Sequence, residues 1–283
     1  MVTILLDNAE LIEARTASDG TKIEILSVKS LAGSSNISLA QDLFFAKEVD
    51  LSLKLVRITL QGSSIRLEPG SLYYMHGDLE IVASSGGGVL KGLSRKMLAG
   101  ETFLVNEIRG HGQIILEPTF GHFLLHEVKA DERGIIVDKG TFFGGTKDLS
   151  VSAAVQKNIS AAMFGGEGLI QTSIHGDGIA ILFSPVPFSE LEIVELNASR
   201  LSVDGNFALV RSAGVKFSVK KSSKSWIATS VSGEGLLQTF EGTGAVWLAP
   251  TQGVYKRLQT PKGILEMSLP PGALSIGEMH KQD

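Results

Sequence analysis

The sequence predicts an all-β protein built from three internal copies of one unit. Glycine makes up 32 of the 283 residues and follows no triplet period, which indicates many tight turns between short strands. One phrase, Gly-Glu followed by a short apolar stretch, Gly-x-Gly and a second apolar run, occurs three times. Its copies are "GETFLVNEIRGHGQIILEP" (100–118), "GEGLIQTSIHGDGIAILF" (166–183) and "GEGLLQTFEGTGAVWL" (233–248).

The similarity continues upstream of the phrase. "RLEPGSLYYMHGDLEI" (66–81) aligns with "IVDKGTFFGGTKDLSV" (136–151), and "IIVDKGTFF" (135–143) aligns with "LSVDGNFAL" (201–209). Units of similar length therefore begin near Ile65, Ile135 and Leu201. The predicted domains are an N-terminal β extension packed on the first repeat (1–60), repeats at 61–134, 135–200 and 201–260, and a C-terminal tail (261–283).

Outside the repeats, the sequence predicts simple connecting elements. "KIEILSVK" (22–29) and "VDLSLKLVRITL" (49–60) are typical of strands, and "ISLAQDLFFAK" (37–47) between them predicts a short helical turn. Prolines fix "SPVPFSE" (184–190) as a loop between the second and third units. The segment with Pro270 and Pro271 is expected to form an exposed tail.

The Gly-x-Gly pairs are predicted to be structural turns. Glycine adopts positive φ without a Cβ penalty, so each pair would let the chain reverse between two strands. A phosphate-binding loop would need a helix directly after the glycines, and strand-like runs such as "GIAILF" follow instead. The glycines concerned are Gly110, Gly112, Gly176, Gly178, Gly242 and Gly244.

The apolar runs after the glycines lack alternation, so both faces of those strands are expected to be covered. A sandwich, three units packed around an axis, or neighbouring subunits of a homo-oligomer would each provide that cover. Trp247 takes the place of Ile115 and Ile181 in the other copies and is therefore expected to fill the core.

Composition excludes several classes of function. A net charge of −4 gives no overall attraction to nucleic acid or anionic lipid. The absence of cysteine excludes disulfides, thiol catalysis and cysteine metal sites. The sequence shows no signal peptide, transit peptide or apolar run of the length that a membrane helix needs, which predicts a cytoplasmic protein.

The motifs resemble a known family. "PGSLYYMHGDLEI", "GGGVLKGLSRKMLAGETF", "GGEGLIQTSIHGDG" and "SGEGLLQTFEGTGAVWLAPT" look like conserved blocks of the AIM family (altered inheritance of mitochondria, member twenty-four), over roughly residues 60–250. The resemblance implies a fold similar to the tryptophan RNA-binding attenuation protein (TRAP-like), with β-sandwich or double-stranded β-helix units arranged as a pseudo-trimer. Fungal members act in mitochondrial inner-membrane organisation, and prokaryotic members have no established activity. None of the attenuation protein's binding residues carries over, so the resemblance implies the fold alone.

Histidine and glutamate offer few candidates for a metal site. No His-x-His occurs, and His122 and His126 share a strand face but stand ~13 Å apart at the usual strand rise. His111 and His175 lie at the Gly-x-Gly pairs and are expected to face solvent. The recurring acids Glu101, Glu167 and Glu234 are expected to brace the fold, although three carboxylates at an axis could also hold a cation. No metal and no cofactor is predicted.

Basic residues recur in the stretch before each Gly-Glu and are the candidate ligand-binding residues. If a three-fold axis relates the units, these residues form one positive rim that attracts an anionic ligand, lipid head groups or an RNA backbone. The alternative is a set of solvated loop lysines. The residues are Lys91, Arg95, Lys96, Lys157, Lys220, Lys221 and Lys224, and "SSGGGVLKGLSRKML" (84–98) is the most plausible phosphate contact.

No nucleophile, base and acid triad stands out, so no catalytic residue is predicted. The favoured hypothesis is a non-enzymatic scaffold or binding protein that engages an unknown protein partner. One alternative is a module that binds an anionic ligand, a membrane surface or RNA through the basic rim, and a second is a cupin-type metal enzyme. Homo-oligomer formation is plausible, whereas nucleic acid and membrane partners are less favoured.

Overall fold

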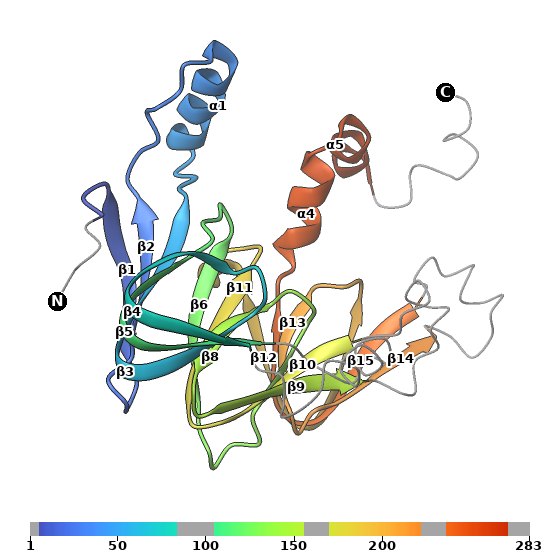
Figure 1. Ribbon diagram of the computed structural model, residues 1–283. Helices are drawn as coiled ribbons and strands as arrows, with labels where there is room; N and C mark the ends of the chain where they lie inside the picture. Colours follow the sequence, from blue (N-terminus) through green and yellow to red (C-terminus); the bar gives the residue numbers. More distant parts are fainter. Residues whose placement is uncertain (1–5, 84–104, 156–169, 222–235, 271–283) are drawn as a thin grey trace, which may run out of the picture.

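The protein is mostly β, as predicted. The computed structural model describes residues 6–83, 105–155, 170–221 and 236–270, whose strands form two antiparallel sheets (Figure 1). The first sheet has the order β1 (Ala9–Thr16), β2 (Lys22–Val28), β3 (Lys54–Leu67), β8 (Phe142–Thr146), β11 (Gly178–Ser184) and β6 (His122–Val128), with β5 (Asn106–Leu116) between β3 and β4 (Leu72–Ala83). The second has the order β12 (Glu192–Asp204), β15 (Leu236–Leu248), β13 (Ala208–Ser212), β7 (Ile135–Val137), β10 (Ile170–Gly176) and β9 (Leu149–Val155), with β14 (Lys216–Lys221) paired to β15.

The N-terminal extension forms the two predicted strands, β2 and β3, and the predicted helical segment is α1 (Ile37–Glu48). The Asn36 side chain caps α1 by accepting hydrogen bonds from the Ser38 and Leu39 amides. Strand β1 was not predicted, because the apolar and polar residues of "AELIEART" do not alternate cleanly. In the structure, Leu11 and Ile12 are both about half exposed. Pairing with β2, rather than an apolar face of its own, makes it a strand.

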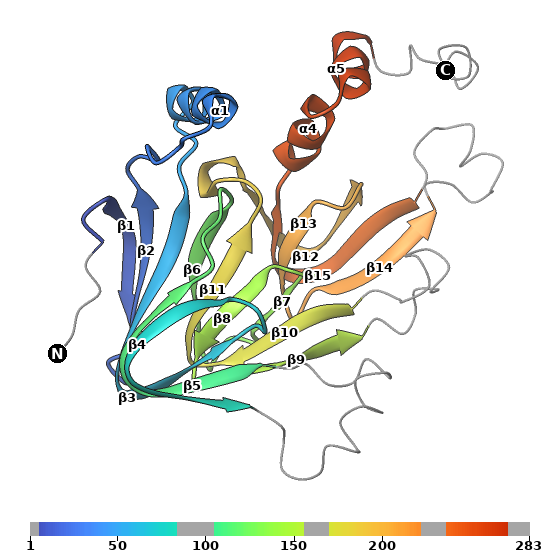
Figure 2. The same ribbon diagram turned by 45° about the horizontal axis from the view of Figure 1, so that its top comes forward.

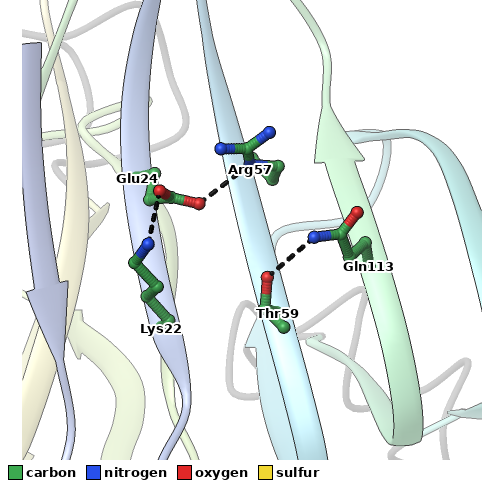
Figure 3. A network of polar contacts seen from close by, with 5 residues as sticks. All are labelled: Lys22, Glu24, Arg57, Thr59 and Gln113. Carbon is green, nitrogen blue, oxygen red and sulfur yellow. Dashed lines mark hydrogen bonds and ion pairs between the residues drawn. The ribbon is translucent and has the colours of Figure 1, made fainter. Parts of the chain in front are cut away.

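An ion-pair network around the buried Glu24 joins β2 to β3 within the N-terminal extension (Figure 3). The Glu24 carboxylate on β2 lies 2.7 Å from Lys22 Nζ and 2.8 Å from Arg57 Nε on β3. Burial raises the pKa of Glu24, but hydrogen bonds from Arg57 and Lys22 outweigh it and hold that pKa below its usual range. Beside this network, Gln113 donates to Thr59 at 3.2 Å.

Corresponding segments of the three sequence copies pair in the same way. The first residue of each unit lies on a strand antiparallel to the one that carries the glycines: Ile65 faces Ile108, Ile135 faces Ile174, and Leu201 faces Phe240. The middle copy is divided between the sheets, since β8 and β11 lie in the first sheet and β7, β9 and β10 in the second. The middle copy therefore joins the two sheets.

The core follows this division. Ile181 belongs to one buried cluster with Ile58 and Ile65, whereas its neighbour Leu182 belongs to a second cluster with Val137 and Phe142. Strand β11 is thus covered on both faces, as its unalternating apolar run predicts.

The prediction that the Gly-x-Gly pairs are hairpin turns is wrong. Strand β5 continues without interruption through Gly110 and Gly112, and strand β15 does so through Gly242 and Gly244. In the middle copy, Gly176 ends β10 and Gly178 begins β11, and these two strands lie in different sheets. Glycine is needed at several of these positions because the facing strand passes very close to the backbone. A Cβ on Gly110 would lie 2.1 Å from the Asp78 carbonyl oxygen, and one on Gly176 would lie 2.3 Å from that of Asp148.

The last described segment, up to residue 270, contains two helices where the sequence predicted none. Helix α4 (Thr251–Leu258) leads into α5 (Pro261–Ser268), which lies in the range predicted as a tail. Pro261 opens α5, and the Thr260 side chain caps it by accepting from the Gly263 amide. The loop at 184–190 is confirmed, and it contains one 3₁₀ turn, η2 (Phe188–Glu190). Within the described ranges, no helix combines the length and the apolar character that crossing a bilayer requires.

Candidate functional site

A groove with a volume of about 760 Å³ runs along strand β6. Strand β6 ends the first sheet and, among the described strands, pairs only with β11. Its residues from His122 to Glu127 line the groove, together with Ile12 of β1, Ile25 of β2, Phe188 of η2 and Trp247 of β15. Because these walls come from distant parts of the chain, only the folded protein forms the groove.

Alternation along β6 explains why two histidines reach the groove. Phe123 and Leu125 point into the first core and are 6% and 7% exposed, so His122, Leu124 and His126 lie on the opposite face. Burial lowers the pKa of His122, and Lys54 lowers it further, while Glu190 partly opposes them. Burial also lowers the pKa of His126, against the smaller opposing effects of Glu132 and Glu127. Both imidazoles are therefore neutral at neutral pH.

Lys54 is the most unusual charged residue of the groove. It begins β3, is only 7% exposed, and its backbone exchanges two hydrogen bonds with Thr119. Burial lowers the pKa of its ammonium group. Among the residues that the structure describes, no carboxylate lies within ion-pair distance of Lys54. The groove thus contains a buried cation without a protein counter-ion in the described ranges.

Aromatic rings form part of the groove wall next to His126. Trp247 makes an edge contact with His126, with ring centroids 5.1 Å apart, and a second edge contact with Phe188 at 6.3 Å. Trp247 was expected to be core filler, but it is only half-buried and presents part of its ring to the groove. It packs on the second core while remaining accessible.

The loop that carries Phe188 is tied to α4. The Glu190 carboxylate accepts a hydrogen bond from the Tyr255 hydroxyl at 2.8 Å and another from the Thr251 hydroxyl. The bonds from Thr251 and Tyr255 hold the pKa of Glu190 below its usual range. These hydrogen bonds therefore connect the rim of the groove to helix α4.

The helices form a second notable surface, which we call the helical end. Helices α1 and α4–α5 project beyond the same end of the sheets (Figures 1 and 2). Helix α1 buries none of its residues, and its Ile37, Phe44 and Phe45 are 89%, 58% and 57% exposed. Large apolar side chains are exposed on α4 and α5 as well: Tyr255, Leu258, Ile264, Leu265 and Met267.

Most of the predicted basic site residues and all of the recurring acids lie outside the described residues. This applies to Lys91, Arg95, Lys96, Lys157 and Lys224, to Glu101, Glu167 and Glu234, and to the loop 84–98. Lys220 and Lys221 belong to β14, opposite Leu237 and Leu236 of β15. Strand β14 pairs only with β15 in the described part of the chain, so Lys220 and Lys221 lie on an edge strand of the second sheet.

His111 and His175 are both exposed, as expected of residues that face solvent, and His175 also contacts the scaffold. His175 Nε2 lies 2.7 Å from Ser173 Oγ, and its Nδ1 lies 2.7 Å from the Arg133 carbonyl oxygen. His111 is on β5, opposite Gln61 and Asp78. Within the described ranges, no three of His, Asp and Glu gather closely enough to hold a metal ion.

Sequence reasoning missed the groove itself. The pairing of His122 with His126 was visible, but Lys54 and Phe188 carried no motif and Trp247 matched core positions. An aromatic residue at a position that is aliphatic in both other copies was the one available signal.

Comparison with known proteins gives one family and one fold. A family model described as "Mitochondrial biogenesis AIM24" matches residues 20–251. Among solved structures, the chain is similar to the crystal structure of a protein from Streptococcus pyogenes, with a TM-score of 0.53 and 22% identity. That match covers 74% of this chain and 94% of the other, and at this identity it supports the fold alone. No curated protein matches.

Proposed function

Since this chain belongs to the Mitochondrial biogenesis AIM24 family, we propose that it is a non-enzymatic scaffold or binding protein that engages a partner protein through the helical end. The observation that carries the proposal is the unburied helix α1, which exposes Ile37, Phe44 and Phe45. Exposed apolar side chains gathered at one end of a molecule mark an interaction surface. Helices α4 and α5 add a second apolar projection at that end.

The structure around α1 supports docking rather than internal packing. An apolar hollow of about 700 Å³ lies between α1 and the segment before it, and Leu31, Leu39, Leu43 and Phe120 contribute to its walls. A partner side chain inserted there would bury apolar surface that the isolated chain leaves in contact with water.

The test compares matched aromatic pairs. A Phe44→Ser/Phe45→Ser variant and a Tyr73→Ser/Tyr74→Ser control each remove two exposed neighbouring aromatic rings, from α1 and from β4 respectively. The tagged full chain is purified from its own cells, and co-purifying proteins are quantified by mass spectrometry. A partner should be lost with the α1 variant and kept with the β4 control, whereas equal recovery in both would contradict the proposal. Light scattering on the same samples identifies a second copy of the chain as the partner if a homo-oligomer dissociates only in the α1 variant.

The proposal includes the architecture, namely three repeats arranged as a pseudo-trimer of the TRAP-like type. The equivalent pairs Ile65 with Ile108, Ile135 with Ile174 and Leu201 with Phe240 support it. An experimental structure provides the test. Units that cannot be superposed by successive rotations about one axis would contradict this arrangement.

A second candidate function is the binding of RNA or of an anionic membrane surface by the basic rim. It is favoured by β14, which carries Lys216, Lys220 and Lys221 within one six-residue edge strand. Replacing Lys220, Lys221 and Lys224 with glutamate should abolish binding to RNA or to anionic vesicles, measured by sedimentation. Unchanged binding would remove this candidate.

A further inference from the structure

We propose that the groove along β6 binds a single amphipathic anion, whose carboxylate or phosphate lies at Lys54 and His122 and whose apolar body lies against Leu124, Phe188 and Trp247. This goes beyond the docking function of the helical end, because the groove is a separate site for a small molecule.

The head-group position follows from charge. A lysine that is 7% exposed loses much of its hydration, and no carboxylate in the described ranges compensates Lys54. A ligand anion would supply that counter-charge and would form a charge-assisted hydrogen bond with the ammonium group. His122 lines the same cavity and provides a second donor next to it.

The opposite end of the groove sets the ligand's orientation. His126, Glu127 and Glu132 lie there, and the two carboxylates are close enough to oppose part of the lowering of the His126 pKa by burial. Arg15 at this end already pairs with Glu13, with 3.0 Å between Nε and Oε1. Glu13, Glu127 and Glu132 outnumber the two cations that line the groove there, Arg15 and Lys129, so the head group belongs at the Lys54 end.

Much of the remaining lining of the groove is apolar. Ile12, Ile25 and Leu124 line it together with the rings of Phe188 and Trp247. His122 and His126 are four residues apart on one strand, so the groove extends at least ~13 Å along β6 at the usual strand rise. Its volume of about 760 Å³ lies within the usual range for small-molecule sites. These dimensions suit an unbranched chain of medium length.

Fluorescence of Trp247 provides the assay. The chain has two tryptophans, so a Trp226→Phe background makes Trp247 the sole emitter. The full-length protein is titrated with decanoate, with decyl phosphate, and with the uncharged analogue decanol. Decanoate or decyl phosphate should give a saturable change in emission, the better probe identifies the head group, and decanol should bind roughly tenfold more weakly or worse.

Variants separate the head-group contact from general apolar binding. Lys54→Met should weaken anion binding roughly tenfold or more, Lys54→Arg should retain it, and the exposed Lys139→Met serves as the control. Phe188→Ala, at a side chain that is 56% exposed, should weaken binding without disturbing the core, so the proposal can be tested even if Lys54→Met fails to fold.

Three outcomes would overturn the inference: neither anion changes Trp247 emission, decanol binds as tightly as both anions, or Lys54→Met binds as well as the parent. Co-purification of partner proteins should be unaffected by Lys54→Met. Loss of partners with the α1 variant and loss of ligand with Lys54→Met are therefore distinguishable results.

Discussion

Ile181 and Leu182 are neighbours on β11, yet each fills a different hydrophobic core. Both are completely buried. Since successive strand side chains point to opposite faces, β11 acts as a shared wall between the two cores. The apolar run that carries these residues is thus explained by two-sided burial.

Substitution of either residue should be costly. Ile181→Ala and Leu182→Ala should each lower the free energy of unfolding by about 2–5 kcal/mol, because each leaves a cavity in a closed core. Urea unfolding followed by circular dichroism measures the change. The control, Ile193→Ala at a position 44% exposed, should stay within about 0.5 kcal/mol. Full stability of Leu182→Ala would show that the second core is not closed around β11.

Gly110 and Gly176 should resist substitution because of close strand approach rather than φ alone. Gly110→Ala and Gly176→Ala should destabilise by more than the roughly 1–3 kcal/mol that positive φ costs a non-glycine residue, since the new methyl would overlap a facing carbonyl oxygen. Thermal unfolding measures the loss. Gly140→Ala is the matched control, because its φ is +79° and nothing lies within 4 Å of the added Cβ. Equal losses at Gly110 and Gly140 would contradict the close-approach explanation.

Stability should fall on mild acidification. Burial lowers the pKa of His122 and His126 in the native state, so the unfolded chain binds more protons below the ordinary value of 6.5. The contribution of the two histidines is therefore complete above about pH 6.5 and is lost as pH falls through the window below it. Urea unfolding of the parent between pH 7 and pH 5 should show this slope, and His122→Gln/His126→Gln should reduce it. An unchanged slope in the double variant would assign the effect to other groups.

Glu190 should control the local stability of α4. Glu190→Ala removes the acceptor of both the Thr251 and the Tyr255 hydroxyl, so amides within residues 251–258 should exchange with deuterium roughly fivefold faster. The exposed Glu192→Ala is the control and should leave α4 unchanged. Protection of α4 that is equal in both variants would mean that its backbone is held by other contacts.

Local pattern determined much of the strand content. The runs around Ile23, Ile58 and Ile181 have strand composition, and each lies in a strand of the first sheet. "ISLAQDLFFAK" predicted a short helical turn, and the structure has a helix there over Ile37–Glu48 with Asn36 as its cap. Strand β1 was missed because it shows no clean alternation, and α5 was missed because its range, 261–283, was predicted as a tail. Helix α4 was missed because its range was assigned to the third repeat.

By itself, the sequence determined that this is a β protein in which one motif occurs three times. These features can be predicted because strand propensity and the pattern of an apolar run depend only on residues that are close in the sequence. Only the tertiary structure decided that the glycines permit strands to pass closely instead of reversing the chain, and that the middle copy is shared between two sheets. It alone brought Lys54, His122 and Trp247 to one groove. The physical reason is that strand pairing joins residues far apart in the chain, and no local pattern specifies which edges will meet.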